Sequence, residues 1–522
     1  MNETANTQDE VLTFLGDPTT HGGAKVQRIN THAASVFLAG RRALKIKRAV
    51  RFPFLDYSTL EKRKQSCEAE LAVNAPFAPE IYRRVIPITR EANGGLAIAG
   101  KGRTIEWAVE MRRFDETRAL DRLAGEIDEN LADALGRAVA AAHEQAPVVA
   151  AAPWIAALKS YLDQNLEAFR EQPDLFEPAA VRALDRDARQ SYRRIRPLLA
   201  ARGELRRVRR GHGDLHLGNI VLIDNRPVLF DAVEFDPLIA AGDVLYDLSF
   251  LLMDLCQRGF AAAANIVLNR YLAETHCIED LDGLAALPLF LSLRAAIRAT
   301  VTAARMDPAP LPPRPAGEGG EEDPQRQAIA GAARAYFAFA RQAIEPPVPK
   351  LIAIGGLSGT GKTRLSRALA PHIAPVPGAV IVRSDVERKA LFGVGETERL
   401  PEQAYAAAAN ERIYALLIEK ARRIVAAGHS AIIDAVFARP QERRALAATA
   451  KSARLDLHGL FLTAALATRL ARVGGRARDA SDADQKVAQA QERYELSPLD
   501  WEAIDASGTV EETLARARAA LD

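Results

Sequence analysis

The sequence predicts two domains, an α+β domain with two lobes followed by an α/β domain built on a parallel sheet. The chain has 522 residues, more than one hydrophobic core usually serves. Hydrophobic patterning also changes along the chain: short strand-like runs come first, long helical patterns follow, and regular strand–helix alternation begins only near residue 349. A glycine-rich turn opens that last region. We therefore expect domains over residues 1–345 and 349–522.

Composition narrows the class of protein. The hydrophobic share is 48% and the formal net charge only +2, so no global basic field favours nucleic acid or an anionic membrane. The three cysteines are far apart and the first ten residues are polar, which predicts a cytoplasmic protein. The most apolar stretch, 281–304, contains Arg294 and Arg298 and is expected to be a core helix, not a membrane span.

The first domain divides into a small lobe over about 20–115 and a large lobe over about 116–345. The small lobe carries three strand-like runs and one amphipathic helical segment, predicted at 34–40, 41–47, 105–113 and 58–74. Helical patterns dominate the large lobe except for a hairpin around 219–237, with its turn at 224–227. Residues 306–325 are rich in proline, glycine and acid, which predicts an exposed insertion followed by a helix.

The second domain alternates strands and helices. Strands are predicted at 350–354, 379–384, 430–436 and 457–463, and a helix at 362–373 follows the first strand. Such alternation requires crossover connections, which place the strands parallel in one sheet.

A phosphate-binding loop is the strongest single signal. Residues 356–363 read GLSGTGKT and match GxxxxGK[ST] between a predicted strand and a predicted helix. Its glycines let backbone N–H groups surround nucleotide phosphates, and the helix N-terminus favours negative charge. We expect Lys362 to reach the β- and γ-phosphates of ATP and Thr363 to ligate Mg²⁺. The candidate nucleotide-binding residues are Gly356, Ser358, Gly359, Thr360, Gly361, Lys362 and Thr363.

Charged residues that follow the loop in the sequence suggest the reaction in which the bound nucleotide takes part. Asp385 follows a predicted strand, where a carboxylate can accept a proton from an acceptor hydroxyl. Arg388, about one turn later, is placed to hold a phosphate, and Asp434 ends the next strand in a position suited to Mg²⁺ or substrate. Arginines in a segment with two glycines predict a mobile lid over the transferring phosphate, with a solvated basic helix face as the alternative; they are Arg469, Arg472, Arg476 and Arg478.

These motifs resemble P-loop kinases that phosphorylate small molecules or nucleic-acid ends. The pattern D-x-x-R from Asp385 to Arg388, with D-x-x-F-x-x-x-x-x-R from Asp434 to Arg443, looks most like the 5′-hydroxyl polynucleotide kinase branch. Gluconate kinases, chloramphenicol phosphotransferases and zeta-type toxins are similar in scaffold. The resemblance implies that Asp385 is the general base and that Arg472 or a neighbour is a lid arginine.

A second motif set lies in the first domain. Residues 211–219 read GHGDLHLGN, in which Asp214 and Asn219 have the spacing of a kinase catalytic loop, and Asp231 follows twelve residues later beyond the hairpin. This set resembles the aminoglycoside phosphotransferase and choline kinase-like family, over about residues 20–345. The resemblance implies that Asp214 is the catalytic base, that Asn219 and Asp231 bind Mg²⁺, and that His212 shapes the loop. It assigns Asp243 and Asp247 to a downstream acidic signature, usually structural.

The small lobe should supply a lysine for the ATP phosphates, paired with a glutamate of the helix. Lys45 and Lys47 share a strand face, and Glu68 and Glu70 share the helix; we predict the pair Lys45–Glu68. Backbone groups near Met111 are expected to bind adenine. No G-x-G-x-x-G is present, and RINTHAASVF, 28–37, lies where that loop would be.

The two motif sets together favour a bifunctional ATP- and Mg²⁺-dependent phosphotransferase that acts on hydroxyl groups of small molecules. One alternative is a single active kinase with a nucleotide-binding regulatory domain; another is a nucleic-acid 5′-hydroxyl or toxin-type kinase in the second domain. Nucleic acid is not favoured, because the few aromatic residues of that half form no stripe. The sequence leaves both acceptors and the oligomeric state open.

Overall fold

The computed structural model describes residues 3–52, 55–123, 125, 127–306, 324–475, 480–494, 496 and 499–521. The chain packs into two compact units: residues 1–158 with 199–254 form unit 1, and residues 159–198 with 255–522 form unit 2. Most of the predicted insertion at 306–325 lies outside the described residues.

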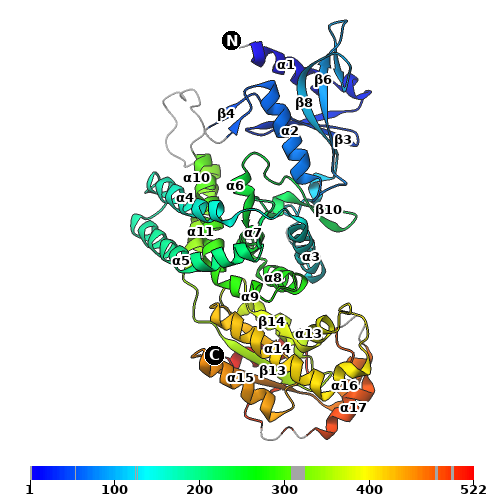
Figure 1. Cartoon of the computed structure of the whole chain (residues 1–522), viewed down its shortest axis with the longest axis vertical. Helices are drawn as coiled ribbons and strands as arrows, with labels where there is room; N and C mark the ends of the chain where they lie inside the picture. The colour runs from blue at the N-terminus through cyan, green and yellow to red at the C-terminus, as the bar shows by residue number, and fades with distance from the viewer. Residues whose placement is uncertain are drawn as a thin grey trace. The chain divides into compact units, whose positions relative to one another are not determined.

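Unit 1 contains an antiparallel six-stranded sheet of order β1-β2-β3-β8-β6-β7. Helix α2 (Leu60–Asn74), capped by the Thr59 side chain, packs on one face around Cys67, and helix α1 (Glu3–Gly16), which the sequence analysis did not predict, packs on the other around Leu15 (Figure 1). Side chains of each strand alternate between these two cores. The strands are β1 (Val26–Asn30), β2 (Ala34–Ala39), β3 (Arg42–Lys47), β6 (Tyr82–Arg90), β7 (Leu96–Ile98) and β8 (Arg103–Arg112), and a small pair is formed by β4 (Arg51–Phe52) and β5 (Leu55–Asp56).

The rest of unit 1 surrounds the predicted catalytic loop. A hairpin of β10 (Ile220–Ile223) and β11 (Arg226–Leu229) turns through Asp224 and Asn225, whose φ angles are 51° and 59°. The turn therefore has two residues, shorter than the predicted 224–227, because two left-handed residues match the twist of the strands. The remaining elements are α3 (Glu129–Gln145), β9 (Val208–Arg210), α6 (Pro237–Ala240) and β12 (Ala241–Asp243); α4 (Ala151–Arg170), α5 (Pro178–Glu204) and α7 (Val244–Gln257) contribute residues to both units.

The helical part of unit 2 comprises α8 (Ala261–Glu274), α9 (Asp280–Gly283), α10 (Leu287–Ala303) and α11 (Pro324–Ile344). The rings of Phe169, Phe176 and Phe337 pack with centroids 4.7–5.2 Å apart. Among the described residues, the helical stretch Asp280–Met306 is long and apolar enough to cross a bilayer, but 67% of its most apolar window is buried within the fold. That burial is what a core helix requires.

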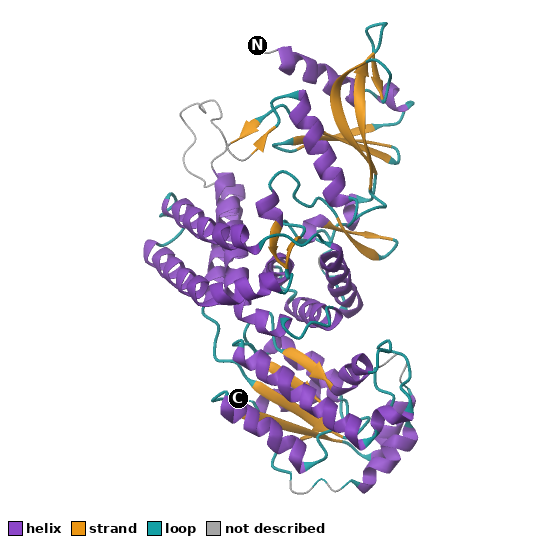
Figure 2. Ribbon diagram, in the orientation of Figure 1, coloured by secondary structure: helices purple, strands orange, loops and turns teal. Residues whose placement is uncertain are grey.

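Unit 2 also contains the predicted parallel sheet, with strand order β14-β15-β13-β16-β17 (Figure 2). The strands are β13 (Leu351–Gly356), β14 (Val380–Arg383), β15 (Ala431–Asp434), β16 (Leu457–Thr463) and β17 (Glu502–Asp505). The sequence analysis did not predict β17, which buries only Ile504. The helices are α12 (Lys362–Leu369), α13 (Ser384–Leu391), α14 (Ala407–Ala426), α15 (Pro440–Ser452), α16 (Leu466–Gly474), α17 (Gln485–Ala490) and α18 (Val510–Ala519). Because the strands are parallel, β13, β14 and β15 all end at one edge, with Arg383 opposite Asp434.

Candidate active sites

The glycine-rich loop of unit 2 connects β13 to α12, as predicted. Gly359 has φ 87°, and a Cβ atom there would lie 2.6 Å from the Arg469 carbonyl oxygen, so no larger residue fits. Gly361 caps α12 with φ 94°, a left-handed conformation that favours glycine. The loop therefore brings its backbone and the first turn of α12 together, which is the arrangement that binds phosphate.

Two side chains that the sequence analysis did not assign to this loop hold it in place. The Arg469 guanidinium, only 2% exposed, donates to the Ser358 carbonyl at 2.9 Å, and the Gln491 amide oxygen accepts from the Ser358 N–H at 2.7 Å. Thr360 donates its hydroxyl to the Leu357 carbonyl at 2.8 Å. Arg469 is thus a buried support of the loop and not an arginine of a lid. Neither role follows from spacing along the chain, because both side chains reach back from over a hundred residues away.

Thr363 and Asp434 meet at the end of the sheet. The Thr363 hydroxyl donates to Asp434 Oδ2 at 2.7 Å, and the Asp434 side chain is buried. A hydroxyl and a carboxylate are oxygen ligands that suit Mg²⁺, which usually keeps several waters and binds phosphate oxygens as well. The two residues therefore fit the predicted ion. Lys362 lies beside them, with its ammonium group 3.3 Å from the Leu357 carbonyl.

Asp385 is the second residue of α13, immediately beyond β14. Burial raises the pKa of its carboxyl, while the charges of Arg383 and Lys362 oppose that shift. Arg383, two residues before Asp385, lies opposite Asp434 in the parallel sheet, so Asp385 leaves β14 at the edge of the sheet where Asp434 ends β15. A carboxylate in this position has the basicity and the location to accept a proton from an acceptor hydroxyl.

Arg388 is more buried than the sequence suggested. Its side chain donates to the Ala404 carbonyl at 2.6 Å and its guanidinium lies 5.1 Å from the centre of the Tyr405 ring. These contacts anchor the segment after α13. The Tyr405 hydroxyl in turn donates to Asp482 at 2.8 Å.

Arg472, the other predicted arginine, lies at the end of α16. It donates to the carbonyls of Ala506 at 2.8 Å and Gly508 at 3.0 Å. The same guanidinium lies 3.9 Å from the position that a Cβ atom of Gly361 would take. Arg472 is therefore beside the phosphate-binding loop and fixed to the 506–508 turn. The predicted lid residues Arg476 and Arg478 lie outside the described residues.

The catalytic-loop residues of unit 1 come together as the spacing predicts. The Asn219 amide donates to Asp214 Oδ2 at 3.1 Å and to the Asp214 carbonyl at 3.0 Å. The Asp214 side chain remains 42% exposed, so its carboxylate can meet an acceptor. The Phe230 N–H donates to the Asn219 carbonyl at 3.0 Å, which brings the segment before Asp231 against the loop.

His212 and Asp247 hold the backbone of this loop in place. The buried His212 ring donates to the Phe230 carbonyl at 2.9 Å, and burial lowers the pKa of this histidine against the opposing charges of Asp247 and Asp214. Asp247 accepts from the N–H groups of His212 and Gly213, each at 2.8 Å. Asp243 forms an ion pair with Arg202 at 2.6 Å. All these contacts are structural.

The lysine–glutamate pair corrects one prediction. Lys45 binds Glu70 at 2.7 Å, and Lys47 binds the other oxygen of Glu70 at 2.6 Å, whereas Glu68 is 55% exposed and lies 3.9 Å from Lys64. Two residues rotate a helix by about 200°, so Glu68 points away from the sheet when Glu70 points toward it. The predicted pair Lys45–Glu68 is wrong, and Glu70 is the partner.

Lys45 also reaches the candidate metal ligand. Its ammonium group lies 2.7 Å from Asp231 Oδ1. Burial alone would lower the pKa of Lys45, but the negative charges of Asp231 and Glu70 outweigh it and hold the pKa well above its ordinary range. Lys47 forms a parallel contact to Glu234, which also accepts from the Tyr57 hydroxyl at 3.2 Å. Both lysines of the strand face predicted to bind phosphate are therefore paired with carboxylates.

Asp231 adopts an uncommon backbone conformation, with φ 61°. Its N–H donates to the Tyr82 hydroxyl at 3.2 Å, and the buried Asn74 side chain binds both the N–H and the carbonyl of Ala232, at 2.7 and 3.2 Å. Asn74 and Tyr82 were not predicted as site residues. Asn74 was detectable only as a polar residue one turn after Glu70 on the same helix face.

Asp214, Asn219 and Asp231 offer two carboxylates and an amide oxygen, a donor set suited to Mg²⁺ bound with ATP. Met111 lies in the predicted strand, near the end of β8, opposite Ala43 and Tyr82, and the strand ends at Arg112. Its part in binding adenine stays a prediction. The predicted phosphate-covering region is a short hairpin turn, 31–33, between β1 and β2.

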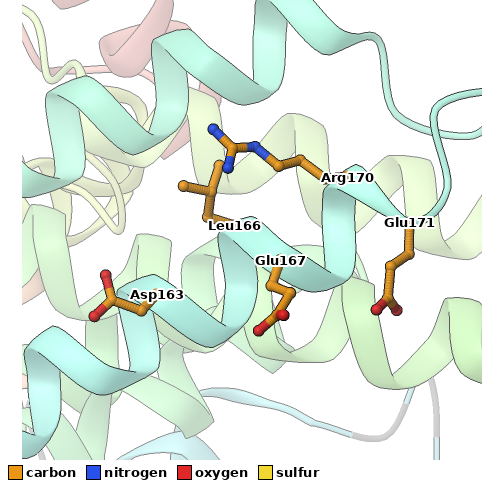
Figure 3. A pocket seen from close by; sticks show the side chains of 5 residues that line it. All are labelled: Asp163, Leu166, Glu167, Arg170 and Glu171. Carbon is orange, nitrogen blue, oxygen red and sulfur yellow. The ribbon is translucent and has the colours of Figure 1, made fainter.

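A separate hollow lies along α4 in unit 2. Figure 3 shows its lining side chains, which project from α4 and from the residue that follows it: Asp163, Leu166, Glu167, Arg170 and Glu171. Asp163 is already paired with Arg189 at 2.7 Å. Nothing in either motif set lies here, and we assign the hollow no role.

Comparison with known proteins finds matches in two separate parts of the chain. A family model described as "Phosphotransferase enzyme family" matches residues 64–287, and one described as "AAA domain" matches residues 351–496. The uncharacterized protein Rv2004c of Mycobacterium tuberculosis (strain ATCC 25618 / H37Rv) and the uncharacterized protein Mb2027c of Mycobacterium bovis are each 28% identical over 504 residues, covering 93% of both chains.

Similar solved structures include a gluconokinase from Sinorhizobium meliloti 1021, 20% identical, which covers 33% of this chain and 92% of its own, with a TM-score of 0.25. A choline/ethanolamine kinase family protein from Mesorhizobium loti is 14% identical and covers 65% of this chain and 99% of its own, with a TM-score of 0.36. The family matches identify the chain as a phosphotransferase enzyme, with a phosphotransferase-family segment followed by a P-loop kinase-like segment.

Proposed function

We propose that the chain is a bifunctional kinase, in which each segment transfers the γ-phosphoryl group of ATP to a hydroxyl of a small molecule. One observation carries this proposal: each unit holds its own carboxylate beside its own nucleotide-binding residues. In unit 1 Asp214 lies beside Asn219, and in unit 2 Asp385 follows β14 at the sheet edge where the Thr363–Asp434 pair lies.

At the first site, Asp214 accepts the proton of the acceptor hydroxyl, and Lys45, held by Glu70, neutralises phosphate charge. At the second site, Asp385 takes the same role, while Lys362 and the N-terminus of α12 hold the phosphates. Mg²⁺, bound by Asn219 and Asp231 in one site and by Thr363 and Asp434 in the other, would neutralise charge on the transferring group. Positioning and charge neutralisation are sufficient for this chemistry.

The experiment is a ³²P-transfer screen with the full chain against sugars, amino alcohols, nucleosides and 5′-hydroxyl oligonucleotides. The variants are D214N, D385N and the double variant, because each keeps the shape of the side chain and removes the base. The exposed residues Asp9 and Asp505 supply matched controls, D9N and D505N. We expect D214N to abolish one set of products and D385N another, each by at least about 100-fold.

If D385N leaves every product unchanged, Asp385 is not a base. If only one of the two variants matters for any acceptor, the other segment binds nucleotide without transfer and the protein has one active kinase. Products on oligonucleotides alone would instead favour a nucleic-acid kinase in unit 2.

A further inference from the structure

We infer that helix α8 positions the P-loop site of unit 2. α8 lies inside the segment matched by the phosphotransferase family, yet it packs within the same compact unit as the parallel sheet (Figure 1). Asn265 and Asn269, four residues apart, lie on one face of this helix, and Arg270 follows Asn269 directly. Through them the phosphotransferase-family segment supports the P-loop site of unit 2. The effect on strand β14 stands by itself, and the effect on catalysis rests on the proposed function.

The first contact is with the backbone of β14, an edge strand of the described sheet. The side-chain amides of Asn265 and Asn269 donate to the Ala379 carbonyl at 3.0 and 3.2 Å, and the Ile381 N–H donates to Asn269 Oδ1 at 2.7 Å. Edge strands otherwise present unpaired N–H and C=O groups. The two asparagines thus bond to backbone groups that a further strand would otherwise pair with. These backbone groups lie shortly before Arg383 and Asp385 in the chain.

The second contact leads to the Thr363–Asp434 pair. Arg270 binds Glu396 at 2.7 Å, and the other oxygen of Glu396 lies 3.7 Å from the Arg383 guanidinium. Arg383 in turn donates to the Thr363 hydroxyl at 3.2 Å and lies 3.7 Å from Asp434.

The side chains of Arg270 and Arg383 are only 13% and 10% exposed, so solvent screens these charges weakly. Glu396 lies in the segment between α13 and α14, and its carboxylate binds Arg270. The Glu396 carboxylate lies near Nη1 of Arg383, whereas Asp434 and Thr363 lie near its Nε and Nη2. Because Glu396 attracts the Arg383 guanidinium, that guanidinium competes less with Mg²⁺ for the Thr363 and Asp434 oxygens. Arg270 is therefore a positioning residue, three contacts away from the Thr363 and Asp434 oxygens, through Glu396 and Arg383.

A second ion pair between the same parts of unit 2 provides a matched control. Asp282 of α9 binds Arg423 of α14 at 2.7 Å, and Arg423 also binds Glu419 on its own helix. Neither contact involves a residue of the phosphate-binding loop. The variant D282N removes a similar contact and should leave the site unchanged. Melting temperatures of all variants report any general loss of stability.

The test is hydrogen–deuterium exchange of the full chain, with variants N269A, R270M and D282N. Without nucleotide, we expect N269A to speed exchange of the Ile381 amide about fivefold to tenfold, as loss of one ordinary hydrogen bond allows. R270M should speed exchange across 384–396, and D282N should change neither. With ATP, we expect R270M to raise the Mg²⁺ concentration that half-protects residues 356–369 at least about threefold.

The inference is overturned if N269A and R270M exchange like wild type and D282N, or if R270M lowers the Mg²⁺ requirement. A wild-type loop that MgATP fails to protect would refute the proposed function. The nucleotide-free arm would still decide whether α8 orders β14 and the segment after it.

Discussion

The Thr363 hydroxyl donates to Asp434 across 2.7 Å, at the point where the first turn of α12 meets the end of β15. This contact joins the last residue of the phosphate-binding loop to the neighbouring strand. It predicts that T363A weakens Mg²⁺-dependent activity of the second site about 10- to 100-fold, the range seen when metal-site contacts are removed. The measurement is kcat/KM against Mg²⁺ concentration in a D214N background. S366A removes a hydroxyl one turn later, bonded to the Lys362 carbonyl, and should behave as the parent.

The two glutamates of α2 should respond differently. E70Q leaves Lys45 and Lys47 buried without their shared counter-charge, a change that costs about 3–5 kcal/mol in comparable buried pairs. E68Q, at an exposed position, should change the free energy of unfolding by less than about 0.5 kcal/mol. Denaturant unfolding measures the free energy of unfolding of each variant, and first-site turnover measures its effect on activity. Equal effects of the two variants would contradict the assignment of Glu70.

Asn74 should matter for the Asp231 conformation. A left-handed residue other than glycine costs about 1–2 kcal/mol, and the Asn74 side chain holds the next peptide in place. N74A should lower stability by about 1–3 kcal/mol and raise the Mg²⁺ requirement of the first site. A Mg²⁺ titration of ATP binding separates these effects. Q65A, an exposed change on the same helix, is the control; an N74A protein with unaltered Mg²⁺ dependence would make Asn74 purely structural.

His429 predicts a pH dependence of stability in unit 2. Burial lowers the pKa of this histidine to about 4, and its ring donates to the Gly378 carbonyl at 2.9 Å. An unfolded histidine takes up its proton near pH 6.5, so the unfolded chain binds more protons below that pH. The contribution is full above about pH 6.5 and is lost as the pH falls toward 4, by about 2 kcal/mol between pH 7 and pH 5.

H429Q keeps a donor for the Gly378 carbonyl and should reduce this pH dependence. Hydrogen exchange of the β15 amides at pH 7 and pH 5, corrected for intrinsic rates, gives the local free energy. H372Q changes an exposed histidine and should retain the wild-type difference. A wild-type difference that survives in H429Q would assign the effect to other groups.

The sequence by itself determined the features that depend on neighbours along the chain. The phosphate-binding loop, the Asp214–Asn219 spacing and the parallel α/β alternation are local patterns, and the family matches and the sheet confirm the architecture they predicted. Periodicity also showed that Lys45 and Lys47 share a face.

Only the tertiary structure decided which helix face meets that strand, and so selected Glu70 over Glu68. It also showed that Arg469 supports the phosphate-binding loop, and it brought Asn269 and Arg270 of α8 to β14 and Glu396. Periodicity states which residues share a face but not what that face packs against. Contacts between residues a hundred positions apart are determined by packing, which no local pattern records.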